Sequence, residues 1–377
     1  MESDHPGSEP SAGCLLQLHR WPAMPSGLAY TAPMSAAGPE ALRRGRRRGE
    51  MTVATIARLA GVSAPTVSKV LNGRSGVALS TRRRVEALLR EHGYQRPISG
   101  PAALIEVVFY ELEVHLAVEI MRGVERVARQ HELAVGFTEM RGRTAAGRAW
   151  TEQVLARRPT GVIAVYSQFT AEQQAQLASS AIPLVALDPT GEPLHSTPSV
   201  GATNWSGGLS ATRHLLDLGH RRIASITGPS GVLCARARLD GYRAAMDASG
   251  VPIEARLVRE GAFSVEDGQR LGRDLLRLGQ PPTAIVCGND LQALGVYEAA
   301  RQAGVRIPDQ LSVVGFDDVE YARWCGPPLT TVRQPLADMG AVAADLVLAL
   351  AAGERPAETR VELATTLVIR QSTAPPA

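Results

Sequence analysis

Three closely spaced helical patterns open the strongly patterned part of the chain. In each, apolar residues recur at the spacing of one helix face. Thr52 and Ser63 are suited to cap the first two helices, and Gly61 is suited to end the first. Two short helices joined by a tight glycine turn and braced by a third helix predict a helix-turn-helix. The predicted helices span residues 53–60, 64–71 and about 80–92.

From residue 104 onward, short apolar stretches alternate with amphipathic helical patterns. This alternation favours parallel sheets with helices on both faces, and its length indicates two similar lobes. Ligands of such folds bind beyond the carboxyl ends of the strands. The first four predicted strands are LIEVVFY (104–110), ELAVGFT (132–138), GVIAVYS (161–167) and IPLVALD (182–188), and four more follow between residues 221 and 370.

Two segments lack a sustained pattern. Residues 1–50 are rich in Pro, Gly, Ser and Ala, a composition that cannot bury enough surface to order itself. They are either a flexible basic arm or a mis-called start upstream of Met51. Residues 95–103, QRPISGPAA, form a linker. The predicted organisation is a 1–50 extension, a 51–94 headpiece, a 95–103 linker and a 104–377 core.

Charge is distributed unevenly along the chain. Thirteen Arg and Lys face three Asp and Glu between residues 41 and 97, so this stretch carries 13 − 3 = +10, whereas the whole chain carries +3. A basic segment on a mildly acidic body indicates a polyanionic partner such as nucleic acid. A solvated arginine-rich tail is the alternative for residues 43–48. Lys69 is the only lysine of the chain.

Several patterns that would indicate other classes of protein are missing. The cysteines at positions 14, 234, 287 and 325 lack CxxC spacing, which favours reduced thiols in a cytoplasm. No apolar run reaches the ~18 residues of a membrane span, and no secretory signal is recognisable. No phosphate-binding loop, nucleophile elbow or HExxH motif is present. We therefore expect a cytoplasmic protein without catalytic residues, metal, cofactor or membrane partner.

Several segments resemble, in order, the LacI/GalR family of bacterial transcriptional regulators. The likeness covers residues 51 to about 372. It implies a periplasmic-binding-protein-like (type I) core of two lobes joined by three crossovers, one lobe at about 104–203 and 335–361, the other at about 204–334 and 362–377. The segments are TVATIARLAGVSAPTVSKVLNG in the headpiece and HLLDLGHRRIASITGP, RARLDGYRAAM, CGNDLQALGVYEAARQAGVRIPDQLSVVGFDD and PPLTTVRQP in the core.

The resemblance makes the second headpiece helix the recognition helix. Ala64, Pro65 and Lys69 match the family's base-reading positions. Lys69 is able to donate to guanine O6 and N7, whereas the other two offer only apolar contacts. Short polar side chains near the helix starts would contact phosphates; capping is the competing role of each hydroxyl, and chance survival of one lysine competes for Lys69. The predicted DNA-binding residues are Thr52, Ala64, Pro65, Thr66, Ser68, Lys69, Asn72 and Thr81.

The linker departs from the family pattern. Family members usually follow the headpiece with a Pro-Asn-x-x-Ala-Arg-x-Leu hinge helix whose leucine opens a base step. The sequence YQRPISGPAALIEVV lacks the Asn, the Ala-Arg pair and the leucine, and Pro97, Gly100 and Pro101 oppose a helix. We therefore predict no leucine-wedge kink at the operator centre, or a weaker one that uses Ile98; the DNA bend angle measures this.

The matching motifs also place a set of side chains around the effector site. Carboxylates accept hydrogen bonds from vicinal hydroxyls, arginine donates as a fork, and an aromatic ring covers an apolar C–H face, so the set suits a neutral polyhydroxylated ligand. Arg238 alternatively forms a structural ion pair, and a lone Phe such as Phe263 is typical of a core. Asp290 and Asp318 are expected to be structural. The predicted ligand-binding residues are Tyr110, Asp188, Arg238, Phe263, Asn289, Asp317 and Gln334.

The resemblance implies a sugar-responsive, sequence-specific regulator. We expect a repressor that binds palindromic double-stranded operator DNA as a homodimer and is released when a small saccharide shifts the population of lobe arrangements. One alternative is a corepressor-dependent regulator with a nucleobase-like ligand, and another is a solute-binding protein of the same core fold. The likeness extends to regulators of xylose or xylo-oligosaccharide operons, which makes these sugars a further expectation.

Overall fold

The computed structural model describes residues 52–71, 76–92, 102–110, 112, 114–140, 146–166, 169–189 and 197–377. Internal contacts divide the chain into two units, Met1–Arg96 and Pro97–Ala377. Three predictions lie outside the described residues, namely the N-terminal extension, the DNA contact Asn72 and the linker up to residue 101.

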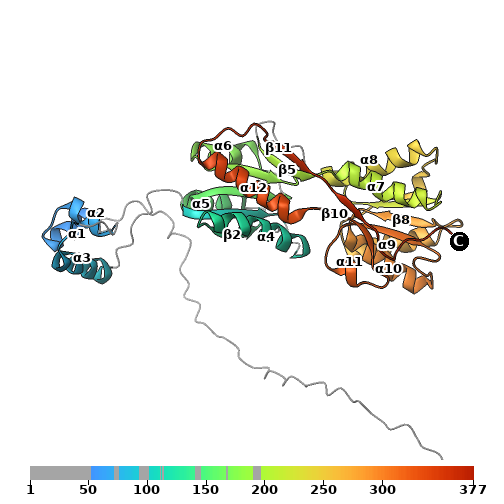
Figure 1. Ribbon diagram of the computed structural model, residues 1–377, viewed down its shortest axis with the longest axis horizontal. Coiled ribbons are helices and arrows are strands. Elements are labelled where there is room, and N and C mark those ends of the chain that lie inside the picture. Colours follow the sequence, from blue (N-terminus) through green and yellow to red (C-terminus); the bar gives the residue numbers. More distant parts are fainter. Residues whose placement is uncertain are drawn as a thin grey trace, which may run out of the picture. The chain divides into compact units, whose positions relative to one another are not determined.

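The headpiece is a bundle of three short helices (Figure 1). Helices α1 (Val53–Ala60) and α2 (Ala64–Leu71) have the predicted bounds, and α3 (Leu79–Glu91) begins and ends one residue earlier than predicted. Thr52 caps α1 by accepting a hydrogen bond from the Thr55 amide at 3.2 Å. Gly61 ends α1 with a φ of 63°, a left-handed conformation that glycine adopts without strain. The core of the bundle comprises Ile56, Ala57, Ala60, Val67, Val70 and Val85.

The first lobe is a six-stranded parallel sheet with helices on both faces. Its strand order is β11-β5-β4-β3-β1-β2. One face packs on α4 (Val114–Gln130) and α12 (Leu336–Ala351), and the other packs on α5 (Ala146–Arg157) and α6 (Ala171–Ser179). The strands are β1 (Ala102–Phe109), β2 (Ala134–Glu139), β3 (Pro159–Val165), β4 (Leu184–Leu187), β5 (Ser199–Ala202) and β11 (Arg360–Leu363).

The second lobe repeats this architecture, as predicted, with strand order β12-β10-β9-β8-β6-β7. All pairs are parallel except β10 with β12. Helices α7 (Asn204–Asp217) and α8 (Leu233–Ala248) cover one face, and α9 (Val265–Leu276) and α10 (Asp290–Ala303) cover the other. The remaining elements are β6 (Ile223–Thr227), β7 (Val258–Glu260), β8 (Ala284–Cys287), β9 (Ser312–Asp317), β10 (Thr330–Arg333), β12 (Thr366–Val368), α11 (Tyr321–Trp324) and the 3-10 turn Ala255–Leu257.

The chain crosses between the lobes three times, as the fold class requires. The crossings follow β5, β10 and β11, and Figure 1 shows the last as the red segment that leaves β11. Two of them are tied together, because the Thr365 amide donates to Thr203 Oγ1 at 2.9 Å. The last crossing begins after Leu363, which still pairs with β5, slightly later than the sequence-based boundary near residue 361. Among the described residues, every helix is too short or too polar to span a lipid bilayer.

Candidate DNA-binding and effector-binding sites

The recognition helix α2 presents its predicted base-reading residues away from the headpiece core. Ala64, Pro65 and Lys69 are exposed, whereas Val67 and Val70 on the opposite side are buried. This alternation follows from the helical period, which turns two apolar residues inward and leaves the intervening positions outside. An exposed ammonium, about one turn after two small apolar residues, therefore lies on the exposed side of the helix.

The hydroxyls predicted to contact phosphates differ in their exposure and in the hydrogen bonds they make within the headpiece. Thr52 is exposed and caps α1, while Ser68 is exposed and Thr66 and Thr81 are half-buried. Ser63 accepts a hydrogen bond from the Thr66 amide at 3.4 Å, and the two hydroxyl oxygens lie 2.9 Å apart. The expectation that Ser63 is a helix cap is confirmed, and capping accompanies any DNA contact that Thr52 makes.

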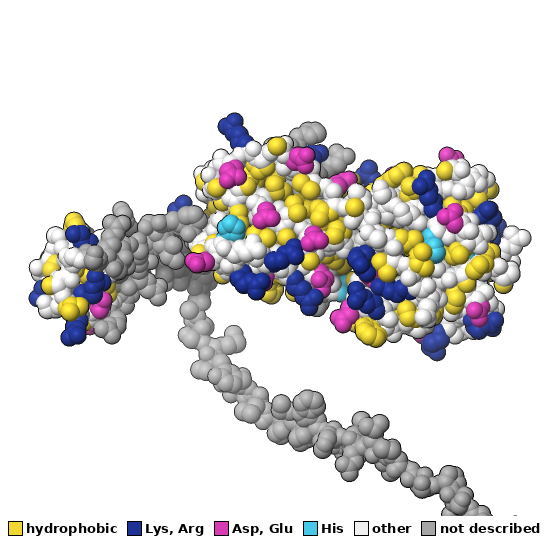
Figure 2. Space-filling view, in the orientation of Figure 1, with side chains coloured by type: hydrophobic (Ala, Val, Ile, Leu, Met, Phe, Trp, Pro, Cys, Tyr) yellow, Lys and Arg dark blue, Asp and Glu magenta, His cyan; other side chains and the backbone are white. Residues whose placement is uncertain are grey.

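The headpiece also carries several basic side chains. Figure 2 shows several Lys and Arg side chains on the visible face of the headpiece. In addition to Lys69, the described headpiece residues include exposed Arg58, Arg83 and Arg84 and half-buried Arg82. A surface of this charge attracts the phosphate backbone without reading its sequence.

The effector cavity lies between the lobes and has a volume of about 190 Å³. Six of the seven predicted ligand-binding side chains line it, contributed by strand ends, by α8 and by the crossing after β10. The other four lining residues are outside the predicted ligand-binding set and come from both lobes. The cavity is lined by Tyr110, Leu116, Tyr166, Val232, Cys234, Arg238, Phe263, Asn289, Asp317 and Gln334.

The seventh predicted residue, Asp188, does not line the effector cavity. It lines a neighbouring cavity of about 430 Å³ instead. Asp188 follows β4 and lines this cavity together with residues at the starts of α7 and α8, and its charge also acts on Asp317 at the end of β9. Cys234, in the first turn of α8, lines both cavities.

Arg238 is the centre of the buried polar groups in the effector cavity. Its Nε donates to Asn204 Oδ1 at 2.8 Å, and its Nη1 donates to the Gly288 carbonyl at 2.6 Å. Nη1 also lies 3.5 Å from Asp317 Oδ1, and the guanidinium lies 3.7 Å from the centroid of the Phe316 ring. The structural ion pair considered as an alternative is therefore present, in a side chain that also lines the cavity.

The Arg238 guanidinium stabilises the ionised form of two buried carboxylates, Asp188 and Asp317. Burial raises the pKa of Asp188 and of Asp317 to about 6 each, and the Arg238 charge opposes both shifts. Asp317 Oδ1 also accepts a hydrogen bond from Gln334 Nε2 at 2.7 Å. Asp188 directly follows β4 and Asp317 ends β9, and both have positive φ, 45° for Asp188 and 112° for Asp317. Strained backbone at strand ends is typical of residues held for a function.

Three buried polar atoms around Arg238 have no hydrogen-bond partner among the described residues. They are Asp188 Oδ2, Gln334 Oε1 and the Tyr166 hydroxyl. Leaving such an atom unsatisfied costs about 1–3 kcal/mol. Two of the three are pure acceptors, so a ligand that brings hydrogen-bond donors would satisfy them.

Phe263 belongs to the cavity wall rather than to a core. Its ring is half-buried and sits over Gly228, where any Cβ would come within 2.1 Å of the ring. Asn289 Nδ2 donates to the Phe263 carbonyl at 3.3 Å, and Asn289 Oδ1 accepts from the Gln292 amide at 2.9 Å. Asn289 therefore positions the Phe263 segment and caps α10 while it lines the cavity.

Of the residues that sequence reasoning missed, Tyr166 carried a detectable signal. It directly follows β3, so it ends a strand in the same way as the predicted residues do. Cys234 carried no signal, because one thiol at a helix start is not distinctive. Burial raises the pKa of the Cys234 thiol to about 12, so the group acts as a small apolar side chain. No group of three metal-binding side chains occurs in the part of the chain that the structure describes.

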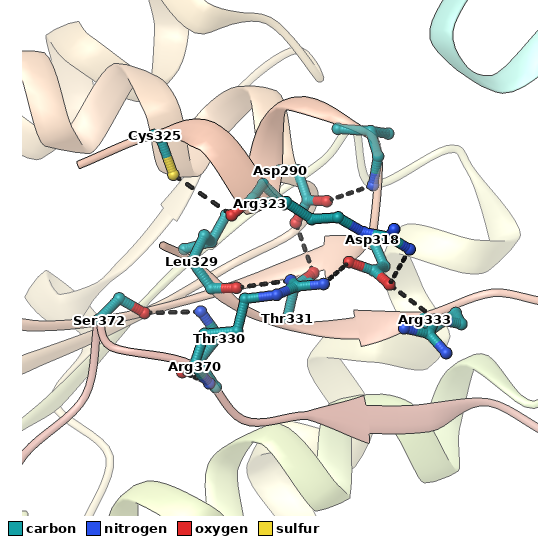
Figure 3. A network of polar contacts seen from close by, with 12 residues as sticks. Asp290, Asp318, Arg323, Cys325, Leu329, Thr330, Thr331, Arg333, Arg370 and Ser372 are labelled. Atoms are coloured by element: carbon teal, nitrogen blue, oxygen red, sulfur yellow. Dashed lines mark hydrogen bonds and ion pairs between the residues drawn. The ribbon is translucent and has the colours of Figure 1, made fainter. Parts of the chain in front are cut away.

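Asp290 and Asp318 are structural, as expected (Figure 3). The Asp318 carboxylate is 1% exposed and meets Arg333 at 2.7 Å and Arg370 at 2.5 Å. Asp290 accepts hydrogen bonds from the Val319 amide and from Thr331 Oγ1. These contacts tie β9, β10 and the C-terminal segment together, which fixes the backbone on which Asp317 is carried.

Known proteins resemble the whole described arrangement. The sequence model of bacterial regulatory proteins of the lacI family matches residues 52–97, and that of the periplasmic binding protein-like domain matches residues 212–373. The transcriptional regulator MalR of Streptomyces coelicolor is 33% identical, over 85% of this chain and 96% of its own length.

Two solved structures are similar across most of the chain. A lac repressor dimer bound to operator and the anti-inducer ONPF is 31% identical, covers 86% of this chain and 100% of its own, and has a TM-score of 0.69. A complex of the transcriptional regulator CelR with cellobiose is 30% identical, covers 85% of this chain and 99% of its own, and has a TM-score of 0.66.

Proposed function

We propose that this chain, which belongs to the LacI family of bacterial regulatory proteins, is a sugar-responsive repressor released from its operator by a small saccharide. The family membership makes it a DNA-binding transcriptional regulator with an effector-binding domain, and its relatives are regulators rather than enzymes. The proposed parts are a neutral sugar effector, a homodimer, a palindromic operator and a cytoplasmic location.

The DNA contacts we propose follow from the exposed side of α2. Lys69 donates to base edges, Ala64 and Pro65 make apolar contacts, and the hydroxyls of Thr52, Thr66, Ser68 and Thr81, with Asn72, contact phosphates. The support is that the first three residues are exposed above a buried apolar core. Footprinting of the protein on sites upstream of its own and neighbouring genes tests this; an absence of protection at low ionic strength would contradict it.

The homodimer is supported by an apolar surface on the first lobe. A hollow of about 710 Å³ lies along α4 and β2, and its lining includes Val118 and Phe137, which are 43% and 60% exposed. β2 is an edge strand of its sheet, and large apolar side chains at such an edge are typical of a surface that another chain covers. A second copy there would present two headpieces to a palindrome. Sedimentation of the full chain measures the state.

The effector chemistry rests on one observation, the buried acceptors without partners beside aromatic walls. Gln334 Oε1 and the Tyr166 hydroxyl have no hydrogen-bond partner among the described residues, and Tyr110, Tyr166 and Phe263 line the cavity with aromatic rings. Arg238 is already neutralised by Asp317, which disfavours an anionic ligand. A neutral ring with several hydrogen-bond donors would pair with both acceptors, pack against the aromatic side chains and leave the Arg238–Asp317 ion pair intact. The cavity is smaller than the ~300–1,000 Å³ of drug-sized ligands, so it favours a single sugar ring.

A screen of ligands on the full chain tests the effector. Thermal shift and operator binding would be measured with neutral monosaccharides, their disaccharides including xylobiose, and nucleobases. We expect one sugar to raise the melting temperature and to weaken operator binding, since a ligand that prefers one lobe arrangement shifts its population. A nucleobase that instead strengthens operator binding would replace this proposal with the corepressor alternative.

A further inference from the structure

The crossing that follows β5 is bonded to the crossing that follows β11. Thr203 is the residue between the end of β5 and the start of α7. Its amide donates to the Leu363 carbonyl at 2.9 Å, and the Thr365 amide donates to its hydroxyl oxygen at 2.9 Å. Thr365 Oγ1 donates in return to the Thr203 carbonyl at 3.2 Å. The two crossings are therefore held together where they leave the first lobe.

Asn204, the next residue, reaches from this crossing to the effector cavity. It is 8% exposed and occupies the first position of α7. Its Nδ2 donates at 3.1 Å to the carbonyl of Ala202, the last residue of β5, and its Oδ1 accepts from Arg238 Nε at 2.8 Å. One side chain thus contacts both the end of a first-lobe strand and the buried guanidinium that lines the effector cavity.

Two hydrogen bonds fix the orientation of the Arg238 guanidinium. Asn204 holds Nε, and the Gly288 carbonyl holds Nη1. Because a guanidinium is planar, acceptors on these two nitrogens determine both the tilt and the rotation of the group. Without Asn204, Nε loses its acceptor while the bond at Nη1 remains. The guanidinium is then able to swivel about the Nη1 contact.

The backbone that carries Arg238 is packed tightly on α7. A Cβ added to Gly208 on α7 would collide with the Arg238 carbonyl on α8, and a Cβ added to Gly241 on α8 would collide with the Trp205 carbonyl on α7. Helices packed this closely behave as one rigid layer. A change in the angle between the lobes is therefore taken up in the crossing before α7, where Asn204 begins the helix.

We propose that Asn204 is a positioning residue for the effector, which sets the orientation of Arg238 according to how the crossing after β5 is held. The inference rests on the proposed function, in which Arg238 contacts the effector. A rearrangement of the lobes alters the contacts between Thr203 and Thr365, displaces Asn204 and reorients the guanidinium. An effector bound to Arg238 in turn favours the lobe arrangement in which Asn204 holds it as described.

The exchange of the Arg238 Nε proton with solvent measures this orientation without any ligand. A nitrogen–proton correlation spectrum of the full chain contains its signal, which is assigned by its loss in Arg238→Lys. We expect slow exchange in the unchanged protein, because the proton is buried and bonded, and exchange faster by about tenfold in Asn204→Leu. Asn204→Asp should restore slow exchange, since a carboxylate oxygen also accepts from Nε.

Thr212→Val is the matched control for these variants. The Thr212 hydroxyl is buried in α7 and donates to the Gly208 carbonyl at 2.8 Å, so its loss removes a buried hydrogen bond of the same helix away from Arg238. The control should leave the Nε exchange unchanged. Equal exchange in Asn204→Leu and in the unchanged protein would overturn the positioning role.

Thr365→Val tests whether the crossings act on Arg238 from a distance. The variant removes the hydroxyl that donates to the Thr203 carbonyl, and the hydrogen bonds of Thr365 to described residues all go to Thr203. We expect faster Nε exchange than in the unchanged protein, by less than in Asn204→Leu. Thr366→Val is the control, because Thr366 is the exposed neighbour. Equal exchange in the two threonine variants would overturn the link between the crossings and Arg238.

Calorimetric titration of the full chain with D-xylose and D-glucose measures the effect on binding. Asn204→Leu should weaken binding about tenfold, whereas Asn204→Asp and Thr212→Val should bind as the unchanged protein does. Equally tight binding by Asn204→Leu would overturn the role of Asn204 in effector binding. If neither sugar bound the unchanged protein, the result would count against the proposed sugar effector, and the Nε exchange rates would still decide the positioning of Arg238.

Discussion

The headpiece and the effector cavity hold their functional side chains in opposite surroundings. On α2, Ala64, Pro65 and Lys69 are exposed, and none of the three belongs to the packed core. In the cavity, Arg238, Asp317 and Gln334 are buried and bonded to one another. Exposed contacts act singly, whereas buried ones act as a unit. Changes in the headpiece should therefore alter binding alone, and changes in the cavity should alter stability as well.

Arg238→Ala should produce the largest effect. It removes the counter-charge of Asp317 and leaves Asn204 Oδ1 and the Gly288 carbonyl without their donor. Breaking a buried ion pair from one side costs about 3–5 kcal/mol of unfolding free energy. Urea denaturation measures this loss. The control is Arg236→Ala, since Arg236 is exposed on the same helix; equal effects of the two variants would contradict the buried network.

Asp317→Asn should reveal the next largest effect, which depends on pH. The pKa of Asp317 is about 6 in the folded protein and 3.8 for an exposed carboxyl, as in the unfolded chain. Between these two pH values the native state therefore binds more protons than the unfolded state. The free energy of unfolding then falls as pH rises from about 4 to about 6, by up to about 3 kcal/mol for this group. The variant should lose that slope.

Denaturation of both proteins across this pH range measures the difference. Asp240→Asn is the control, because Asp240 is exposed on α8 and should leave the slope unchanged. A sugar that donates to ionised Asp317 should bind more weakly as pH falls through about 6, because protonation removes an acceptor. An affinity that rises on acidification would contradict direct contact with the carboxylate.

The sequence predicts the headpiece more completely than the effector cavity, for a physical reason. Capping by Thr52 and Ser63, the glycine stop at Gly61 and the apolar face of α2 are decided by residues within one or two turns. Such signals lie side by side in the chain. The bounds of α1 and α2 could therefore be predicted from residues 52–73 alone.

The cavity depends on residues far apart in the chain. The resemblance gave six lining residues by motif, but Asp188 lines the neighbouring cavity and Tyr166 was missed. Both follow strands of the first lobe, and which cavity each one faces depends on how that lobe meets α7 and α8. No local sequence pattern predicts this packing. No local pattern predicts either that Arg238 donates hydrogen bonds to Asn204 and to the Gly288 carbonyl.

Lys69→Ala tests the headpiece, and we expect its effect to be smaller than those of the two cavity variants. Loss of a lysine contact to guanine should cost about 1–3 kcal/mol of discrimination between operators and leave urea denaturation unchanged. Lys69→Arg should restore the preference, since a guanidinium also donates to O6 and N7. Arg83→Ala is the control, because loss of an exposed cation should weaken binding to all sequences alike. Unchanged base preference in Lys69→Ala would contradict the proposed reading.

Thr52 combines a structural role with a proposed DNA contact, and its substitution should give the smallest effect. Its hydroxyl caps α1 and is also a proposed phosphate contact. Thr52→Ala should lower the protection of α1 amides from hydrogen exchange by about 1 kcal/mol and weaken DNA binding. Thr52→Asp keeps the cap but brings a negative charge to the phosphate, so exchange protection should remain while operator affinity falls. If Thr52→Asp bound operator as tightly as the unchanged protein, Thr52 would be a cap alone.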